Sequence, residues 1–126
     1  MKKISLFLAG MMLFSSLAYA TITEKVLGQS TVLSASNSTI YTVPASTTAV
    51  VKTIWVTNTT ATDTTIEMWA GSAAGDANKL MDGVTIPASD FMQVSTYLPL
   101  ETTDTLQAKG STNVALSVSL FGAELT

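Results

Sequence analysis

The sequence predicts an all-β fold, an antiparallel β-sandwich or jelly roll of about eight short strands, preceded by a signal-peptide-like N-terminal segment. Three observations lead to this prediction. Runs in which apolar residues alternate with polar ones recur along the chain. Turn-forming residues separate these runs at intervals of about 8–12 residues, the spacing typical of sandwiches and barrels. No sustained stretch has the 3.6-residue apolar rhythm of a helix, so parallel βαβ units are not expected.

The first twenty residues have the organisation of a secretory signal peptide. Two lysines form a positive start, an apolar stretch runs from Ile4 to Leu17, and Ala18-Tyr19-Ala20 has the small-x-small pattern that signal peptidase recognises. The apolar stretch is shorter than the roughly 20 residues that span a bilayer, so cleavage is favoured over a transmembrane anchor. We therefore expect two parts, a signal peptide at 1–20 and a single β-sandwich domain at 21–126 with no stable membrane span.

The first half of this domain has four strand candidates. A short run, Ile22–Leu27, opens it, and a second, Thr39–Val43, ends at a Pro-Ala-Ser turn. The run Val50–Thr57 is apolar on both faces, which predicts a central strand. In Thr65–Ala70, Ile, Met and Ala alternate with Thr, Glu and Trp, as expected of a half-buried strand.

The second half has four more candidates. Val114–Leu120 is the clearest, because four apolar side chains alternate there with alanine and serine. The other three are bounded by turn signals that contain Asp-Gly, a second Pro-Ala-Ser, Pro99 or Lys-Gly, and they are Val84–Ile86, Met92–Leu98 and Thr105–Lys109. The resulting sheets would have exposed edges, and Ile22–Leu27 and the C-terminal strand are the candidates for pairing with a neighbouring subunit.

The residue types that are missing exclude several kinds of chemistry. The chain has no cysteine and no histidine, and all six basic residues are lysine. A Ser-His-Asp triad, a Cys/His zinc site and an arginine clamp for phosphate therefore cannot be built from it. After cleavage, four lysines would face nine acidic residues, a net charge of −5 that disfavours nucleic-acid binding. We expect a protein that is not an enzyme, with no catalytic residues, cofactor or metal.

Acidic residues do not change this expectation. Six of them fall in expected loops, where turn formation and solubility explain them: Asp63, Asp76, Asp82, Asp90, Glu101 and Asp104. A hydrolase that uses two carboxylates is disfavoured because no acid pair can be identified. The loop from Gly75 to Gly83 lacks the ligand order of an EF-hand, so calcium binding is disfavoured as well.

Aromatic residues are the candidates for contact with a partner or a glycan. Trp55 and Trp69 lie on the more polar faces of their strands, and Tyr41 and Tyr97 complete the candidate set. Packing in the core, under loops or against a second subunit is the alternative explanation for all four. Asn37-Ser38-Thr39 and Asn58-Thr59-Thr60 also fit the N-glycosylation pattern, which matters only in a eukaryotic secretory pathway.

Several short motifs, in order, resemble a known class of proteins. They are an LGQ at Leu27–Gln29, YTVPAST at Tyr41–Thr47, a buried strand ending in Asn58, the turn Pro87–Asp90, the L-x-x-x-D-T-L of Leu100–Leu106 and the LFGAE of Leu120–Glu124. Together they resemble small β-structured virion proteins of tailed bacteriophages, of the tail-fibre, minor-tail or head-decoration (capsid-decoration) type. The resemblance covers nearly all of residues 22–126. It implies a non-enzymatic structural or attachment protein of the virion that forms a homo-oligomer, with a trimer as the first expectation, and that contacts other virion proteins.

The signal-peptide-like segment supports an alternative. Tailed phages assemble in the cytoplasm, so a virion component should not carry an export signal. The alternative is an exported bacterial β-sandwich that is secreted, periplasmic or on the cell surface. Examples are an adhesin, a fibre subunit or a carbohydrate-binding module. Its partners would be cell-surface proteins or a glycan. Both hypotheses predict a protein whose role is packing and contact.

Overall fold

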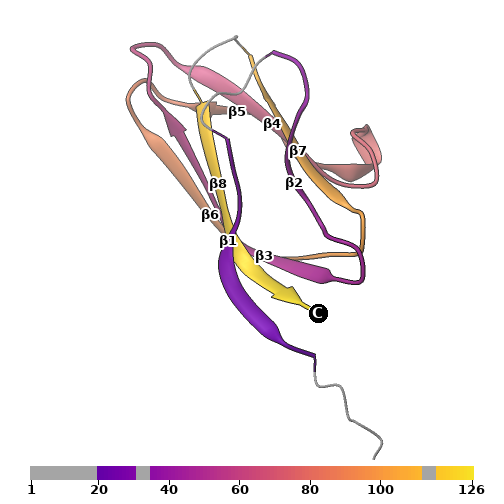
Figure 1. Ribbon diagram of the computed structural model, residues 1–126. Coiled ribbons are helices and arrows are strands. Elements are labelled where there is room, and N and C mark those ends of the chain that lie inside the picture. The colour runs from indigo at the N-terminus through magenta and orange to yellow at the C-terminus, as the bar shows by residue number, and fades with distance from the viewer. Residues whose placement is uncertain (1–19, 31–34, 112–115) are drawn as a thin grey trace, which may run out of the picture.

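Eight antiparallel strands form two four-stranded sheets in the computed structural model, which describes residues 20–30, 35–111 and 116–126. Figure 1 shows the two sheets, here called sheet A and sheet B, facing one another as a β-sandwich. The predicted all-β fold of about eight strands is therefore confirmed. In spatial order, sheet A contains β1 (Ile22–Ser30), β8 (Leu116–Leu125), β3 (Thr48–Asn58) and β6 (Phe91–Leu100), and sheet B contains β2 (Ser38–Thr42), β7 (Thr105–Gly110), β4 (Thr64–Gly71) and β5 (Lys79–Ile86).

One hydrophobic core lies between the sheets, because side chains alternate between the two faces of each strand. The strand β3, predicted to be central, pairs with β8 on one side and β6 on the other. Both sheets contribute fully buried side chains to the core, among them Val51, Ile54, Val56, Val118 and Leu120 from sheet A and Ile66, Met68, Ile86 and Leu106 from sheet B.

Two predicted turns lie inside strands instead. The strand β5 begins at Lys79, not at Val84, and Asp82-Gly83 lies within it. Gly83 has a φ of 59°, where the register between β4 and β5 shifts, so the Asp-Gly pair forms a bulge and not a turn. Pro99 lies within β6, which is an edge strand of sheet A and therefore tolerates a residue that has no backbone N–H.

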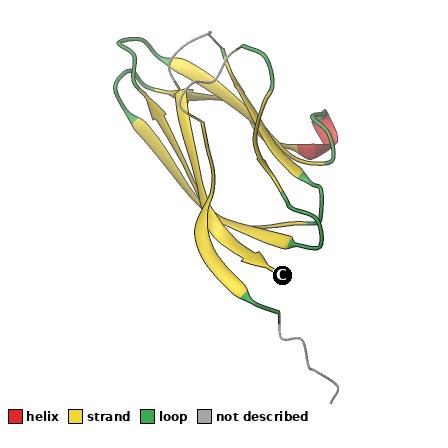
Figure 2. Cartoon of the chain, viewed as in Figure 1, coloured by secondary structure: helices red, strands yellow, loops and turns green. Residues whose placement is uncertain are grey.

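Two predictions fall partly outside the described residues. The signal-peptide-like segment 1–20 does so except for Ala20, and the C-terminal strand is described only from Leu116 onward. Among the described residues, no helix is long and apolar enough to cross a membrane. The short 3-10 turn η1 (Asp76–Asn78) is the helix drawn in Figure 2.

The side chain of Asn58 joins two turns at one end of the sandwich. It is 1% exposed, and its Nδ2 lies 2.8–3.0 Å from the carbonyl oxygens of Thr62, Ile86 and Pro87. Its Oδ1 accepts hydrogen bonds from the backbone N–H and the hydroxyl of Thr60. A buried amide that meets all these partners fixes the β3–β4 and β5–β6 turns relative to each other.

Gly28 brings β1 close to sheet B. A Cβ at this position would collide with the carbonyl oxygen of Ile40 in β2, and the register between β1 and β8 shifts between Val26 and Gly28. The glycine of the LGQ motif therefore allows the backbone of β1 to close one side of the sandwich. Before Gly28, the start of β1 runs alongside the end of β8. There, Thr21 and Thr126 exchange backbone hydrogen bonds of 3.0 and 3.2 Å.

Candidate contact surface

Exposed apolar side chains gather on one face of the molecule. Among the described residues, seven large apolar side chains are exposed, and six of them lie on the outer face of sheet A. We call these six the aromatic face: Ile22 and Val26 of β1, Trp55 of β3, Phe91 and Tyr97 of β6, and Phe121 of β8. The seventh, Leu80, lies in β5 of sheet B.

Strand alternation places these side chains together. Trp55 lies between two buried residues of β3 and therefore points away from the core. The same alternation in β6 exposes Phe91 and Tyr97. Phe121 of β8 pairs with Val26 of β1, which places two of the apolar side chains next to each other.

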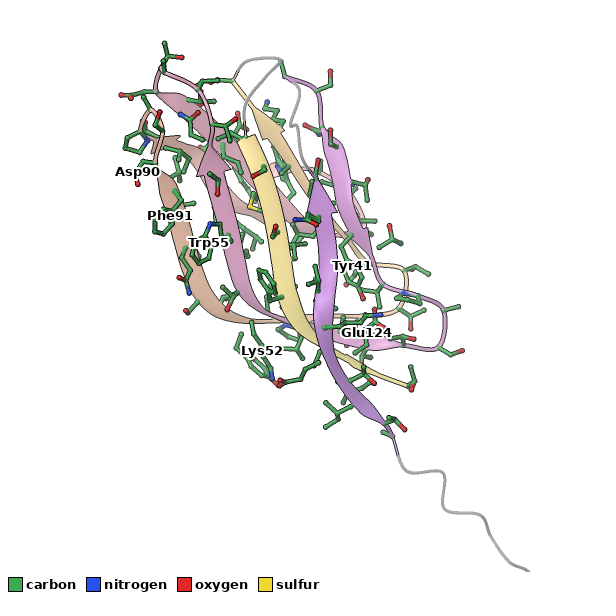
Figure 3. All side chains as sticks on the ribbon, turned by 60° about the vertical axis from the view of Figure 1, so that its left-hand side comes forward. Tyr41, Lys52, Trp55, Asp90, Phe91 and Glu124 are labelled. Carbon is green, nitrogen blue, oxygen red and sulfur yellow. The ribbon has the colours of Figure 1, made fainter. Side chains whose placement is uncertain are left out.

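Trp55 and Phe91 form the most ordered part of the aromatic face. Their ring centroids are 4.8 Å apart and their planes differ by 10°, a stacked pair. The indole Nε1 of Trp55 donates a hydrogen bond of 3.1 Å to the hydroxyl of Thr57. Figure 3 shows the two rings on neighbouring strands, with Asp90 at the start of β6, where its carboxylate accepts a hydrogen bond from the backbone N–H of Phe91.

Two shallow hollows border the aromatic face, and they meet at Lys52. The smaller measures about 190 Å³ and is lined by Ile22, Val50, Lys52, Tyr97, Ala123 and Leu125. The larger measures about 420 Å³, and its lining includes Val26, Lys52 and Phe121. Lys52 forms an ion pair with Glu24, whose pKa it holds below the usual value by hydrogen bonding and by charge.

The outer face of sheet B has a different character. Its tryptophan, Trp69, is 6% exposed because two lysines cover it, with the Nζ atoms of Lys79 and Lys109 at 5.7 and 5.5 Å from the ring centroid. Glu67 binds both lysines, at 3.4 and 3.2 Å. Lys79 also pairs with Asp82 at 3.0 Å, and this hydrogen bond raises the pKa of the lysine.

A charged group is also buried at the end of sheet A. The hydroxyl of Tyr41 donates a 2.8 Å hydrogen bond to Glu124, and Lys25 pairs with the same carboxylate at 2.6 Å. Figure 3 shows the side chains of Tyr41 and Glu124 directed toward each other. Burial and the neighbouring carboxylate raise the pKa of Tyr41, whereas the hydrogen bond from Lys25 lowers the pKa of Glu124.

The four aromatic residues singled out in the sequence therefore have three different environments. Trp55 and Tyr97 lie on the aromatic face, Trp69 lies under lysines on the opposite sheet, and Tyr41 is buried. Sequence reasoning missed Phe91, which stacks on Trp55, and the exposed Phe121. Strand alternation was the available signal for Phe121, because it follows the inward-facing Leu120.

The loop acids have structural partners. Asp63 accepts a 3.0 Å hydrogen bond from the backbone N–H of Ala88 in another turn, whereas Asp90 and Asp104 accept theirs, at 2.8 and 3.0 Å, from the backbone N–H of Phe91 and of Glu101, close by in the chain. Asp76 and Asp82, the acids of the loop considered for calcium, both pair with Lys79. Within the described parts of the chain, no three acidic side chains come close enough together to hold a metal ion.

Compared with known proteins, the chain matches no family model, no curated protein and no solved structure.

Proposed function

We propose that this protein is a non-enzymatic structural or attachment component of a phage particle, of the tail-fibre, minor-tail or capsid-decoration type, and that the aromatic face is its contact surface. The observation that carries the proposal is the gathering of six of the seven exposed large apolar side chains on one sheet. Exposed apolar side chains that gather on one face are typical of an interaction site.

The order of the strands supports the same proposal. The pairs β1·β8, β2·β7, β3·β6 and β4·β5 are those of a ribbon folded back on itself, which favours the jelly-roll form of the sandwich. Viral capsid and lectin domains use jelly rolls. Because one fold serves many functions, the strand order adds to the argument from the aromatic face and does not replace it.

Mass spectrometry of purified particles tests this proposal. We expect peptides from residues 21–126 in particles that have been washed free of soluble protein. Particles without such peptides, from cells that contain the protein, would contradict a virion role.

A second candidate function is that of an exported surface protein that binds glycans. The signal-peptide-like segment and the stacked Trp55–Phe91 pair favour it, since sugar rings pack on exposed aromatic side chains. A glycan array with the wild type and Trp55→Ala tests it. Binding that is lost in the variant supports this function, and the absence of binding to any glycan contradicts it.

N-terminal sequencing of the native protein separates the two functions. A chain that begins at Thr21 in the periplasm or the medium favours export. A retained Met1, or a start upstream of Thr21 in purified virions, favours the particle component.

A further inference from the structure

The aromatic face has the size of a protein–protein interface. Each fully buried aromatic side chain removes about 150–250 Å² from water, so the exposed fractions of its four aromatic rings amount to about 300–500 Å². A four-stranded sheet with ten-residue strands covers about 600 Å² in projection. A standard interface buries about 800 Å² on each partner. The side chains that project from the sheet add to its projected area, so the area of this face approaches that value.

The charge of the face restricts the kind of partner. Among the described residues, Glu24 and Lys52 are the charged side chains on the outer face of sheet A, and they pair with each other. Lys25, next to Glu24 in β1, binds Glu124 instead. The Lys52–Glu24 pair carries no net charge, so the face suits a partner surface without a strong charge of either sign.

The rest of the chain carries a net negative charge. From residue 21 onward the chain has four lysines and nine acidic residues, a net charge of −5. This charge disfavours the orientations of two copies in which unpaired acidic side chains face each other. The aromatic face is an exception, since its two charges cancel.

We infer that the partner of the aromatic face is a second copy of this chain, packed face to face through sheet A of both copies. This inference rests on the proposed function, because it names the partner of the same contact surface. A two-fold axis lets one patch serve both copies, and two sheets can stack about 10 Å apart with their side chains interdigitated. The resulting assembly is a dimer, where the resemblance to virion proteins led us to expect a trimer.

Within this dimer, Tyr97 and Phe91 are the side chains with most to gain. They are 76% and 52% exposed in one copy, the largest fractions among the four aromatic rings of the face. Burial of large aromatic side chains in an interface accounts for much of its binding free energy. Their removal should therefore weaken the dimer while leaving the core of each copy intact.

The test is the oligomeric state of the full chain, purified in the form that the cell retains. Light scattering after size exclusion and sedimentation equilibrium should give a dimer at micromolar concentration. Tyr97→Gln and Phe91→Gln should each weaken it about tenfold or more. Leu80→Gln is the matched control, because Leu80 is 42% exposed on sheet B, and it should leave the dimer unchanged.

A second measurement covers a variant that folds poorly. Acrylamide should quench the fluorescence of Trp55 less as the wild-type concentration rises, because the partner covers the indole. A wild type that is a monomer over the whole range overturns the inference, and so does an oligomer that Leu80→Gln weakens and Tyr97→Gln does not. The particle assay above is independent of these results, so either proposal can fail alone.

Discussion

Two tryptophans on the outer faces of the two sheets have opposite environments. Trp69 of β4 lies under Lys79 and Lys109 and is 6% exposed, whereas Trp55 of β3 stacks on Phe91 and is 37% exposed. Sheet B covers its aromatic ring with charges from its own chain. Sheet A has the ion pair Lys52–Glu24 beside its aromatic side chains but not over them. This difference is the reason for proposing sheet A, and not sheet B, as the contact surface.

The two tryptophans should therefore contribute differently to stability. We expect Trp69→Ala to lower the free energy of unfolding by about 3–5 kcal/mol, because it empties a nearly buried position. Trp55→Ala should cost about 1 kcal/mol, since it removes a stacking partner at the surface. Urea unfolding at low protein concentration, where self-association does not contribute, measures both. Equal losses in the two variants would contradict the comparison.

The buried carboxylate of Glu124, at the end of sheet A, tests the contrast between a charged sheet B and an apolar sheet A, because it is a charged group of sheet A. Lys25 lowers the pKa of Glu124 below its ordinary value of 4.5, so the ionised form is favoured in the folded state. Its contribution to stability is present above pH 4.5 and is lost as the pH falls through the lowered pKa. We expect the urea midpoint to drop in acid, and to drop less in Glu124→Gln.

Glu24→Gln is the control for this acid titration. Glu24 is exposed, and solvent screens its ion pair with Lys52, so the variant should retain most of the acid dependence. If Glu24→Gln flattens the profile and Glu124→Gln does not, the buried carboxylate is not the source of the acid sensitivity. In alkali the pH dependence of stability has the opposite direction at Tyr41, because its pKa is raised. Its contribution to stability is present below tyrosine's ordinary pKa of 10.0 and is lost as the pH rises above that value.

The smallest effects are expected from the ion pairs on the two faces. Glu67→Gln removes the carboxylate that binds both lysines over Trp69, and we expect a small but measurable decrease in the urea midpoint. It should also increase acrylamide quenching of Trp69 in a Trp55→Phe background. Glu24→Gln at neutral pH should change neither quantity. A larger loss of stability from Glu24→Gln would mean that the pair on sheet A is the more important one.

The sequence allowed the strands to be predicted because alternation and turn residues are local signals. Val50–Thr57 was predicted to be central from its apolar residues alone, and β3 has that place. The bulge at Gly83 was missed because Asp-Gly has the same local preference in a turn and in a bulge. Sheet order could not be predicted, since it depends on pairing between strands far apart in the chain.

The environment of each aromatic side chain was predictable only in part. Trp55 and Trp69 were both placed on polar faces, and both point outward from the core. What distinguishes them is Lys109, which is distant in sequence and reaches Trp69 because β7 pairs with β4. Tyr41 gave no local sign of its bond to Glu124, which lies 83 residues away and is brought close by β8.

The environment of Asn58 bears on how the protein can be produced. The sequence Asn58-Thr59-Thr60 is an acceptor for oligosaccharyltransferase in a eukaryotic secretory pathway, yet its amide nitrogen is enclosed by three carbonyl oxygens in the folded chain. All three carbonyls, on Thr62, Ile86 and Pro87, are translated later than the acceptor itself. Modification and folding would therefore compete in time for the same nitrogen atom, and a sugar attached first would have no room in the turn. A bacterial host removes this competition.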